Sequence, residues 1–196
     1  MLTFDDIIDS FARVCPKKTV VSDDIRSLSY SNLQTNGSNL AAFFKKNKIN
    51  KGDRVAFLSY NRIEFAEILY ATSKLGAIVM PINFRLSREE IASIVNDANP
   101  KFFLYERKFF KTKNYLVKNN YLAKHMAVCI DTKNYFKLLT KTKSTYPLNL
   151  KNSKKNDNWS LMYTSGTTGK PKGVIRNHEG YYLLSSITSI ELKIKK

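Results

Sequence analysis

Ten consecutive residues of this chain combine the side-chain types that bind a polyphosphate. The segment Thr164-Ser-Gly-Thr-Thr-Gly-Lys-Pro-Lys-Gly173 contains four hydroxyl residues, three glycines and two lysines. Glycines allow backbone N–H groups to approach an anion closely, and the hydroxyl groups add further donors. Lys170 and Lys172 supply positive charge, and Pro171 between them restricts the backbone. The segment therefore predicts a cradle for phosphate oxygens.

The spacing excludes two other phosphate-binding motifs. A Walker A loop ends in Gly-Lys-Ser/Thr, which this chain lacks, and Pro171 stands five positions after Gly166. The G-x-G-x-x-G fingerprint of dinucleotide-binding proteins is also missing from the sequence. The alternative interpretation is an ordinary surface loop rich in Gly, Ser and Thr. The density of donors directly after the predicted strand 160–163 favours the phosphate cradle.

A strand must present this loop, and residues 160–163 are predicted to form it. Elsewhere, short apolar strands alternate with helices of about 10–15 residues, which is typical of α/β proteins with a layered parallel β-sheet flanked by helices. Ligands of such sheets bind beyond the carboxyl ends of the strands. The other expected strands are 19–22, 27–30, 55–58, 77–80, 102–105 and 126–130.

Short local signals predict where several elements begin and end. A Ser or Thr followed three residues later by an acidic residue is a capping box at a helix start, and glycine frequently ends a helix. The signals are Thr3 with Asp6 as a capping box, Ser31 as the cap of a helix to about residue 47, Gly76 as the end of a helix from residue 64, Pro81 as the end of strand 77–80, and Ser87 with Glu90 as a second capping box.

The net charge of +17 is concentrated in one part of the chain. Residues 1–100 carry 13 basic and 11 acidic side chains, whereas residues 101–155 carry 14 and 2. Lysine supplies 25 of the 33 basic residues and asparagine is also abundant, a bias expected from an AT-rich coding sequence. Aromatic residues between these lysines could stack on bases. We favour the alternative that these aromatic residues pack in the core and that the lysines lie on the solvent-facing side of the same elements. We therefore expect no nucleic-acid partner.

The cysteine content and the hydropathy of the chain indicate in which cellular compartment it is expected. Cys15 and Cys129 provide neither a disulfide framework nor a metal-binding pair. The N-terminal residues are acidic where a secretory signal is basic. The apolar runs are far shorter than the roughly 18 residues that span a bilayer. These observations predict a reduced, soluble, cytoplasmic protein without a transmembrane segment.

Residues Tyr163–Val174 closely resemble the phosphate-loop signature of the AMP-forming, adenylate-forming enzymes, which include the acyl-CoA synthetases. The resemblance extends from about Phe4 to about Ser189 and implies the N-terminal portion of the large domain of such an enzyme. The upstream segments that carry it are Leu28-Ser-Tyr30, Lys51-Gly-Asp-Arg-Val-Ala56, Lys74-Leu-Gly-Ala77, Pro81-Ile-Asn-Phe-Arg-Leu-Ser87 and Asp97-Ala-Asn-Pro100.

The resemblance implies a reaction in two steps. A carboxylic acid, here a fatty or related acid, attacks the α-phosphate of ATP with Mg²⁺ to give acyl-AMP and pyrophosphate, and coenzyme A then displaces AMP. Lys172 matches the fixed lysine of the family, whereas Lys170 stands where the family varies. The resemblance assigns no catalytic or metal-binding residue in this chain. It implies that the β- and γ-phosphates are held by Thr164, Ser165, Gly166, Thr167, Thr168 and Gly169.

His178 follows the loop at a position where many relatives carry a histidine near the carboxylate substrate. The resemblance therefore implies a substrate contact for His178. The alternative is a residue at the entry of a helix that touches no ligand. Tyr181 and Tyr182 are expected to pack within the fold rather than to contact substrate.

The length of the chain departs from the family pattern. Members run to roughly 500 residues or more, several domains' worth of chain, whereas this chain has 196. We expect residues 1–196 to form a partial AMP-binding domain with its phosphate loop at 163–174 and the C-terminal domain absent. A frameshift or early stop is the hypothesis for this truncation.

Three classes of function are compatible with these observations. The favoured one is the N-terminal fragment of an acyl-CoA synthetase, inactive alone because both reactants need the missing half of the site. The second is a non-catalytic binder of nucleotide or pyrophosphate, or one half of a split enzyme with a separately encoded C-terminal part. The third is a basic nucleic-acid-binding protein, which rests on net charge alone.

Overall fold

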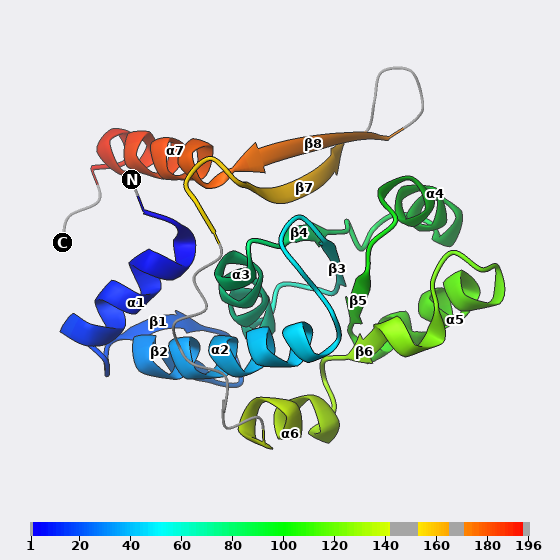
Figure 1. Cartoon of the computed structure of the whole chain (residues 1–196), viewed down its shortest axis with the longest axis horizontal. Helices are drawn as coiled ribbons and strands as arrows, with labels where there is room; N and C mark the ends of the chain where they lie inside the picture. Colours follow the sequence, from blue (N-terminus) through cyan, green and yellow to red (C-terminus); the bar gives the residue numbers. More distant parts are fainter. Residues whose placement is uncertain (1, 142–152, 165–170, 194–196) are drawn as a thin grey trace.

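The computed structural model describes residues 2–141, 153–164 and 171–193. At its centre lies a six-stranded sheet with the strand order β6-β5-β3-β4-β7-β8 (Figure 1). The first five strands pair in parallel, and β8 runs antiparallel to β7. The strands are β3 (Arg54–Leu58), β4 (Ile78–Pro81), β5 (Phe102–Tyr105), β6 (Ala127–Cys129), β7 (Asn158–Thr164) and β8 (Lys172–Asn177).

Helices cover both faces of the parallel strands. Along β5, Phe102 and Leu104 pack with helices on one face, whereas Phe103 and Tyr105 pack with helices on the other. Because successive side chains of a strand point to opposite faces, every residue of β5 is buried. The first face is covered by α2 (Tyr30–Lys46), α3 (Ile63–Leu75) and α6 (Lys133–Lys141), and the second by α4 (Arg88–Ala98) and α5 (Phe110–Lys118).

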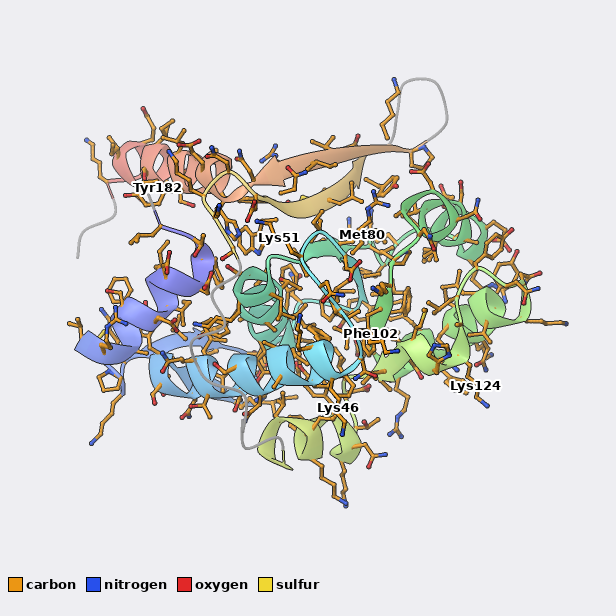
Figure 2. All side chains as sticks on the ribbon, in the orientation of Figure 1. Lys46, Lys51, Met80, Phe102, Lys124 and Tyr182 are labelled. Atoms are coloured by element: carbon orange, nitrogen blue, oxygen red, sulfur yellow. The ribbon has the colours of Figure 1, made fainter. Side chains whose placement is uncertain are left out.

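We call strands β3 to β6 with helices α2 to α6 the parallel core. Its interior is apolar, and its lysines lie at the periphery. Figure 2 shows Met80 and Phe102 among the side chains around the sheet and Lys124 at the outer edge. Met80 and Phe102 are almost completely buried, while Lys124 is exposed. The predicted layered α/β fold is confirmed.

An N-terminal unit packs against the outside of α2 and α3. It consists of α1 (Phe4–Val14) and the hairpin of β1 (Thr19–Ser22) and β2 (Ser27–Ser29). Ile8 of α1 joins Leu33 and Tyr70 in a small apolar cluster. Helices α2 and α3 approach closely at Gly37, where an added Cβ would lie 2.3 Å from the Tyr70 ring.

A buried ion pair fixes α1 to α3. Lys74 Nζ lies 2.7 Å from Asp9 Oδ2, and the Tyr70 hydroxyl donates to Asp9 Oδ1 at 2.5 Å. Burial alone would raise the pKa of Asp9, but the hydrogen bonds from Lys74, Tyr70 and Gln34 hold it below the usual value. Asp9 is therefore ionised in the folded protein at neutral pH.

The predicted helix signals are mostly confirmed. Thr3 and Ser87 cap α1 and α4 with complete capping boxes, and Gly76 ends α3 in the left-handed conformation. The prediction of Ser31 as the cap of α2 was wrong. Ser29 Oγ accepts from the Asn32 N–H at 3.2 Å, so the helix begins two residues earlier, at Tyr30.

Strand β4 ends at Pro81, as predicted, although Pro81 itself belongs to the strand and the strand begins at Ile78 rather than at Ala77. Pro81 lies opposite Phe57 in the parallel register of β3 and β4. Proline cannot donate to a neighbouring strand, and the next residue does so instead, because Ile82 N–H donates to the Phe57 carbonyl at 2.9 Å.

The sheet is mixed rather than wholly parallel. Seven residues separate Thr164 from Lys172 in the sequence, which is too short for the crossover that a parallel pair needs. The chain therefore returns as a hairpin, and β8 pairs antiparallel with β7. Helix α7 (His178–Glu191) follows directly. We call β7, β8 and α7 the hairpin–helix unit.

The aromatic residues of the basic stretch divide between core and surface. Phe102, Phe103 and Tyr135 are buried, as their interpretation as core positions requires. Tyr121 and Phe136 are instead 37% and 39% exposed. No helix within the described residues is long and apolar enough to cross a membrane.

Candidate functional site

The hairpin–helix unit presents the predicted phosphate loop at the carboxyl end of β7. In the register of the hairpin, Thr164 lies opposite Lys172 and Tyr163 opposite Gly173. Thr164 and Lys172 are both exposed, so the two residues paired at the end of the hairpin stem are open to a ligand. The remaining predicted phosphate contacts, Ser165, Gly166, Thr167, Thr168, Gly169 and Lys170, lie outside the described residues.

The base of the loop is fixed to the parallel core through Tyr163. Its hydroxyl donates a hydrogen bond to the Asp97 carboxylate of α4. Burial, and then this hydrogen bond, raise the pKa of Tyr163. Gly173 makes room for the Tyr163 ring across the hairpin, because an added Cβ would lie 3.3 Å from that ring and 2.9 Å from Leu161. The stem of the loop is therefore held in one register.

A groove of about 260 Å³, mostly apolar and with a few polar side chains, lies beside this stem, where β3 and β4 also end. Its lining includes Ser59 and Asn61, which follow β3, and Asn83, which follows β4. Sequence reasoning did not single out these residues. Their position directly after two buried strands was the available signal, because ligands of parallel sheets bind at that edge.

His178 lies at the opposite end of β8 from Lys172. Six residues of strand separate the ends, roughly 20 Å at the usual rise. The structure therefore does not bring these two predicted site residues together. His178 begins α7 and is only 3% exposed.

The imidazole of His178 is held between aromatic and backbone groups. It stacks on Trp159 with ring centroids 4.8 Å apart, and Trp159 stacks on Phe4 at 5.1 Å. The Phe4 N–H donates to His178 Nδ1 at 3.4 Å. Burial lowers the pKa of His178, although the nearby carboxylates of Asp5, Asp157 and Asp6 oppose this. The ring is therefore neutral at pH 7, with its proton on Nε2.

An apolar cavity of about 320 Å³ opens beside this aromatic stack. Its lining comes from α1, α3, β4, β7 and α7, and includes Trp159 and His178. Tyr181, which also lines it, shares a 2.8 Å hydrogen bond with Ser160. Tyr182 lines the cavity but is 40% exposed, so it is not the packed helix residue that the sequence predicted.

Hydrogen bonds to the buried carboxylate of Asp5 join α1 to α3 and to the segment that precedes β7. Asp5 is fully buried, and its Oδ1 accepts hydrogen bonds from Thr3, Ser73 and Ser153 at 2.7, 2.5 and 3.2 Å. Ser153 belongs to the segment that leads into β7. Across the described ranges, His, Cys, Asp and Glu residues form no group of three that could hold a metal ion.

Comparison with known proteins gives a consistent result. Residues 8–195 match the AMP-binding enzyme family. The chain is 31% identical over 165 residues to long-chain-fatty-acid–CoA ligase FadD13 of Mycobacterium tuberculosis, covering 84% of this chain and 32% of the relative. It is 30% identical over 180 residues to 4-hydroxybutyrate–CoA ligase 2 of Metallosphaera sedula, covering 85% and 32%. The chain thus spans about a third of the length of these relatives.

Solved structures show the same fold. The N-terminal domain of FACL13 from Mycobacterium tuberculosis superimposes with a TM-score of 0.77 at 26% identity, covering 93% of this chain and 46% of that one. A long-chain-fatty-acid CoA ligase, described as putative, from Rhodopseudomonas palustris has a TM-score of 0.86 at 23% identity, covering 99% and 49%. The second likeness concerns the fold alone.

Proposed function

Because this chain belongs to the AMP-binding enzyme family, we propose that it supplies the phosphate-binding part of an ATP-dependent acid–thiol ligase. In this proposal a carboxylic acid, most simply a fatty acid, reacts with ATP and Mg²⁺ to form acyl-AMP, and coenzyme A then takes the acyl group. Residues 1–196 form part of the large domain, with the phosphate loop at 163–174. The observation that carries the proposal is the placement of Thr164 and Lys172, exposed and opposite each other, at the carboxyl end of β7.

The residues of the loop would act by position and charge. Backbone N–H groups and hydroxyls from Thr164 to Gly169 would donate to the β- and γ-phosphates, with Lys170 beside them. Lys172 would offset the charge that develops on the departing pyrophosphate, which is electrostatic stabilisation of a transition state. Tyr163 holds the stem of the loop against α4 through its hydrogen bond to Asp97. A contact of His178 with the acid is also part of this proposal.

The exposed apolar face of α7 favours a second candidate that keeps the same phosphate site. The chain covers 32% of the relatives' length, and several apolar side chains of α7 are exposed. The chain would then act as one half of a two-part enzyme, together with a polypeptide that supplies the rest, or would bind nucleotide or pyrophosphate without catalysis.

Calorimetric titration of the chain with Mg²⁺-ATP and with pyrophosphate tests the phosphate site. We expect saturable binding that Lys172→Met weakens about tenfold or more, because a charge-assisted hydrogen bond is lost. Lys124→Met is the matched control, since Lys124 is exposed at the far edge of the parallel core (Figure 2). Equal affinities of the two variants would contradict the site.

Exchange of labelled pyrophosphate into ATP then separates the candidates. Acid-dependent exchange by the chain alone would show a complete activation site. Binding of ATP without exchange supports the half-enzyme or the non-catalytic binder. Absence of binding to both ATP and pyrophosphate would contradict the proposed function in every form.

A further inference from the structure

Residues 107–126 form a basic tip at one end of the molecule. They comprise the short 3₁₀ helix η1 (Arg107–Phe109), α5 and the short 3₁₀ helix η2 (Lys124–Met126). In Figure 1, α5 lies at the far end of the longest axis, on the opposite side from α1. The segment carries six basic side chains and no acidic one. A protruding end with one sign of charge can meet a flat, negatively charged surface.

Most of this charge reaches solvent. Lys113 is largely buried, with its Nζ 4.6 Å from the centre of the Phe110 ring and 2.6 Å from Asn114 Oδ1. The other five basic side chains are exposed. They are Arg107, Lys108, Lys111, Lys118 and Lys124.

The carboxylates on either side of the basic tip are engaged by the protein. Glu106 Oε2 accepts from Ser59 Oγ at 3.1 Å and from the Tyr60 N–H at 3.2 Å. Asp131 Oδ1 accepts from the Arg107 N–H at 2.8 Å. Both acidic residues are only partly exposed. The neighbours of the tip in the sequence therefore compensate little of its positive charge.

A bias towards lysine codons does not account for this segment by itself. Such a bias adds lysine but does not remove aspartate and glutamate. Residues 1–100 carry 11 acidic side chains beside their 13 basic ones, whereas residues 107–126 carry none beside six. The absence of acidic residues is a local property of the basic tip.

The outer face of α5 combines lysines with an apolar ring. Phe110, Lys111, Asn114 and Lys118 are all exposed and follow one face of the helix at spacings of three and four residues. The Phe110 side chain is 49% exposed. Helices that lie on anionic membranes have this arrangement, because the ring enters the boundary of the acyl chains while the lysines stay among the headgroups.

An open hollow of about 580 Å³ adjoins this face. Its lining is mostly apolar and includes the rings of Tyr105 and Phe110. Arg107, Lys108 and Lys111 also border it. Apolar surface next to cations suits the boundary between the headgroups and the acyl chains of a bilayer.

Two observations favour a lipid surface over a nucleic acid. Four of the five exposed cations are lysines, which lack the planar fork by which arginine binds phosphates and bases in a fixed geometry. Proteins that bind single strands without sequence preference stack successive bases on several aromatic rings along a groove. The outer face of α5 offers the single ring of Phe110. A fluid array of anionic headgroups requires neither feature.

We propose that the basic tip docks this chain on a membrane surface that contains anionic phospholipids. Lys111 and Lys118 lie among the headgroups, and Phe110 reaches the boundary of the acyl chains. The tip adjoins β6 at one edge of the sheet, whereas the predicted phosphate site belongs to β7 and β8 at the other edge. The proposal therefore goes beyond the proposed function and stands or falls separately from it.

Cosedimentation of the chain with lipid vesicles tests the proposal. One set of vesicles contains phosphatidylcholine alone, and the other contains equal parts of phosphatidylcholine and phosphatidylserine. We expect binding to the second set only, and release when the ionic strength is raised, because salt screens the attraction between lysines and headgroups. Equal binding to both sets, or no binding to the vesicles with phosphatidylserine, would overturn the proposal.

A matched pair of double variants locates the binding surface. Lys111→Gln with Lys118→Gln should weaken binding to the phosphatidylserine vesicles about tenfold or more, since each lysine near the surface contributes about fivefold. Lys17→Gln with Lys18→Gln removes the same charge from two exposed lysines that follow α1, at the other end of the molecule (Figure 1). This control should change the affinity by less than about twofold.

A second pair of variants tests the apolar contact. Phe110→Ala should weaken binding severalfold and leave its salt dependence unchanged, because it removes apolar contact area and no charge. Phe11→Ala removes a ring of similar exposure, 44% against 49%, from α1 and should leave binding unchanged. The urea midpoint of each variant shows that the fold is retained. Equal affinities of Phe110→Ala and the unmodified chain would contradict the insertion of this ring.

Two further outcomes would assign the charge differently. Equal losses in the two lysine double variants would show that net charge alone drives binding, and would overturn the basic tip as a docking surface. A duplex RNA that binds more tightly than the phosphatidylserine vesicles, and loses affinity in Lys111→Gln with Lys118→Gln, would assign the tip to nucleic acid and likewise overturn the proposal. Binding of Mg²⁺-ATP should be the same in all of these variants.

Discussion

The parallel core and the hairpin–helix unit differ in how many of their sides are covered. In the parallel core, helices lie on both faces of the sheet, and strands such as β5 are buried throughout. In the hairpin–helix unit, β8 is almost wholly exposed, and within the described part of α7 only His178 is buried. Leu183, Leu184 and Ile187 of α7 are 46–58% exposed.

Because of this difference, the residues that stabilise the fold and the residues expected to bind ligand lie mainly in different regions. Buried apolar area supplies most of the free energy of folding, and here it lies in the parallel core. The hairpin–helix unit carries the phosphate loop and one wall of the apolar cavity, and the pairing of β7 with β4 joins it to the sheet. Substitutions in the two regions are therefore expected to have separable effects.

The largest contrast is expected from one substitution made in both regions. Leu40 of α2 is fully buried and Leu184 of α7 is 48% exposed. Leu40→Ala removes packed methyl groups and leaves a cavity, so it should lower the free energy of unfolding by about 2–5 kcal/mol. Leu184→Ala should change it by no more than about 0.5 kcal/mol. Urea unfolding followed by far-ultraviolet circular dichroism measures both, and similar losses would contradict the comparison.

A smaller contrast is expected from two ion pairs of the same kind. The side chains of Lys74 and Asp9 are 9% and 18% exposed, whereas those of Lys155 and Glu179 are 49% and 31% exposed. Lys74→Met leaves Asp9 with only its hydrogen bonds from Tyr70 and Gln34. It should cost about 2 kcal/mol, less than a fully buried pair would.

The matching exposed substitution should have little effect. Lys155→Met removes a solvent-screened pair and should cost less than about 0.5 kcal/mol. Both variants are compared by urea midpoint at constant ionic strength. A loss for Lys155→Met as large as that for Lys74→Met would show that the contacts of the hairpin–helix unit matter as much for stability as those of the core.

The smallest expected effect is a dependence on pH that originates at His178. Burial lowers the pKa of this imidazole in the folded state, whereas an unfolded histidine titrates near 6.5. Its contribution to stability is therefore complete above about pH 6.5 and is lost as the pH falls through the lowered folded pKa. Relative to His178→Asn, the unmodified chain should lose stability between pH 7 and pH 5, because the folded state resists protonation of this imidazole.

Urea unfolding of both proteins at several pH values measures this difference. Leu40→Ala is the control, because its loss of stability should be the same at each pH. A constant difference between the unmodified chain and His178→Asn from pH 7 to pH 5 would contradict the burial of a neutral imidazole at the base of the hairpin–helix unit.

Sequence reasoning succeeded where the determining contacts are local. The capping boxes at Thr3 and Ser87 and the helix end at Gly76 depend on residues within four positions, and all three are confirmed. The apolar runs of the parallel core were equally readable, because strands buried on both faces are continuously apolar. The error at Ser31 arose because Ser29 competes for the same helix start, and only the observed hydrogen bond decides between them.

The features that sequence reasoning missed depend on distant contacts. Phe4 and His178 are 174 positions apart, and nothing local to either predicts their hydrogen bond or the aromatic stack with Trp159. Strand β8 has five exposed residues of six and no alternation of buried and exposed positions, so its pattern did not indicate a strand. The Gly-, Ser- and Thr-rich motif after β7 predicted a phosphate-binding loop. The phosphate contacts assigned to Ser165 to Lys170 stay a prediction, because these residues lie outside the described part of the chain.

The pairing of Thr164 with Lys172 has a consequence for which changes the loop can absorb. The hairpin stem fixes the two ends of the loop, and the entropy of loop closure grows only with the logarithm of loop length. Doubling the length of the loop would cost only about 0.6 kcal/mol. One residue inserted into β8 would instead slip the register and turn its side chains to the opposite face of the sheet. An insertion in the loop should therefore cost little stability while it displaces the predicted phosphate contacts, whereas an insertion in β8 should disrupt the stem itself.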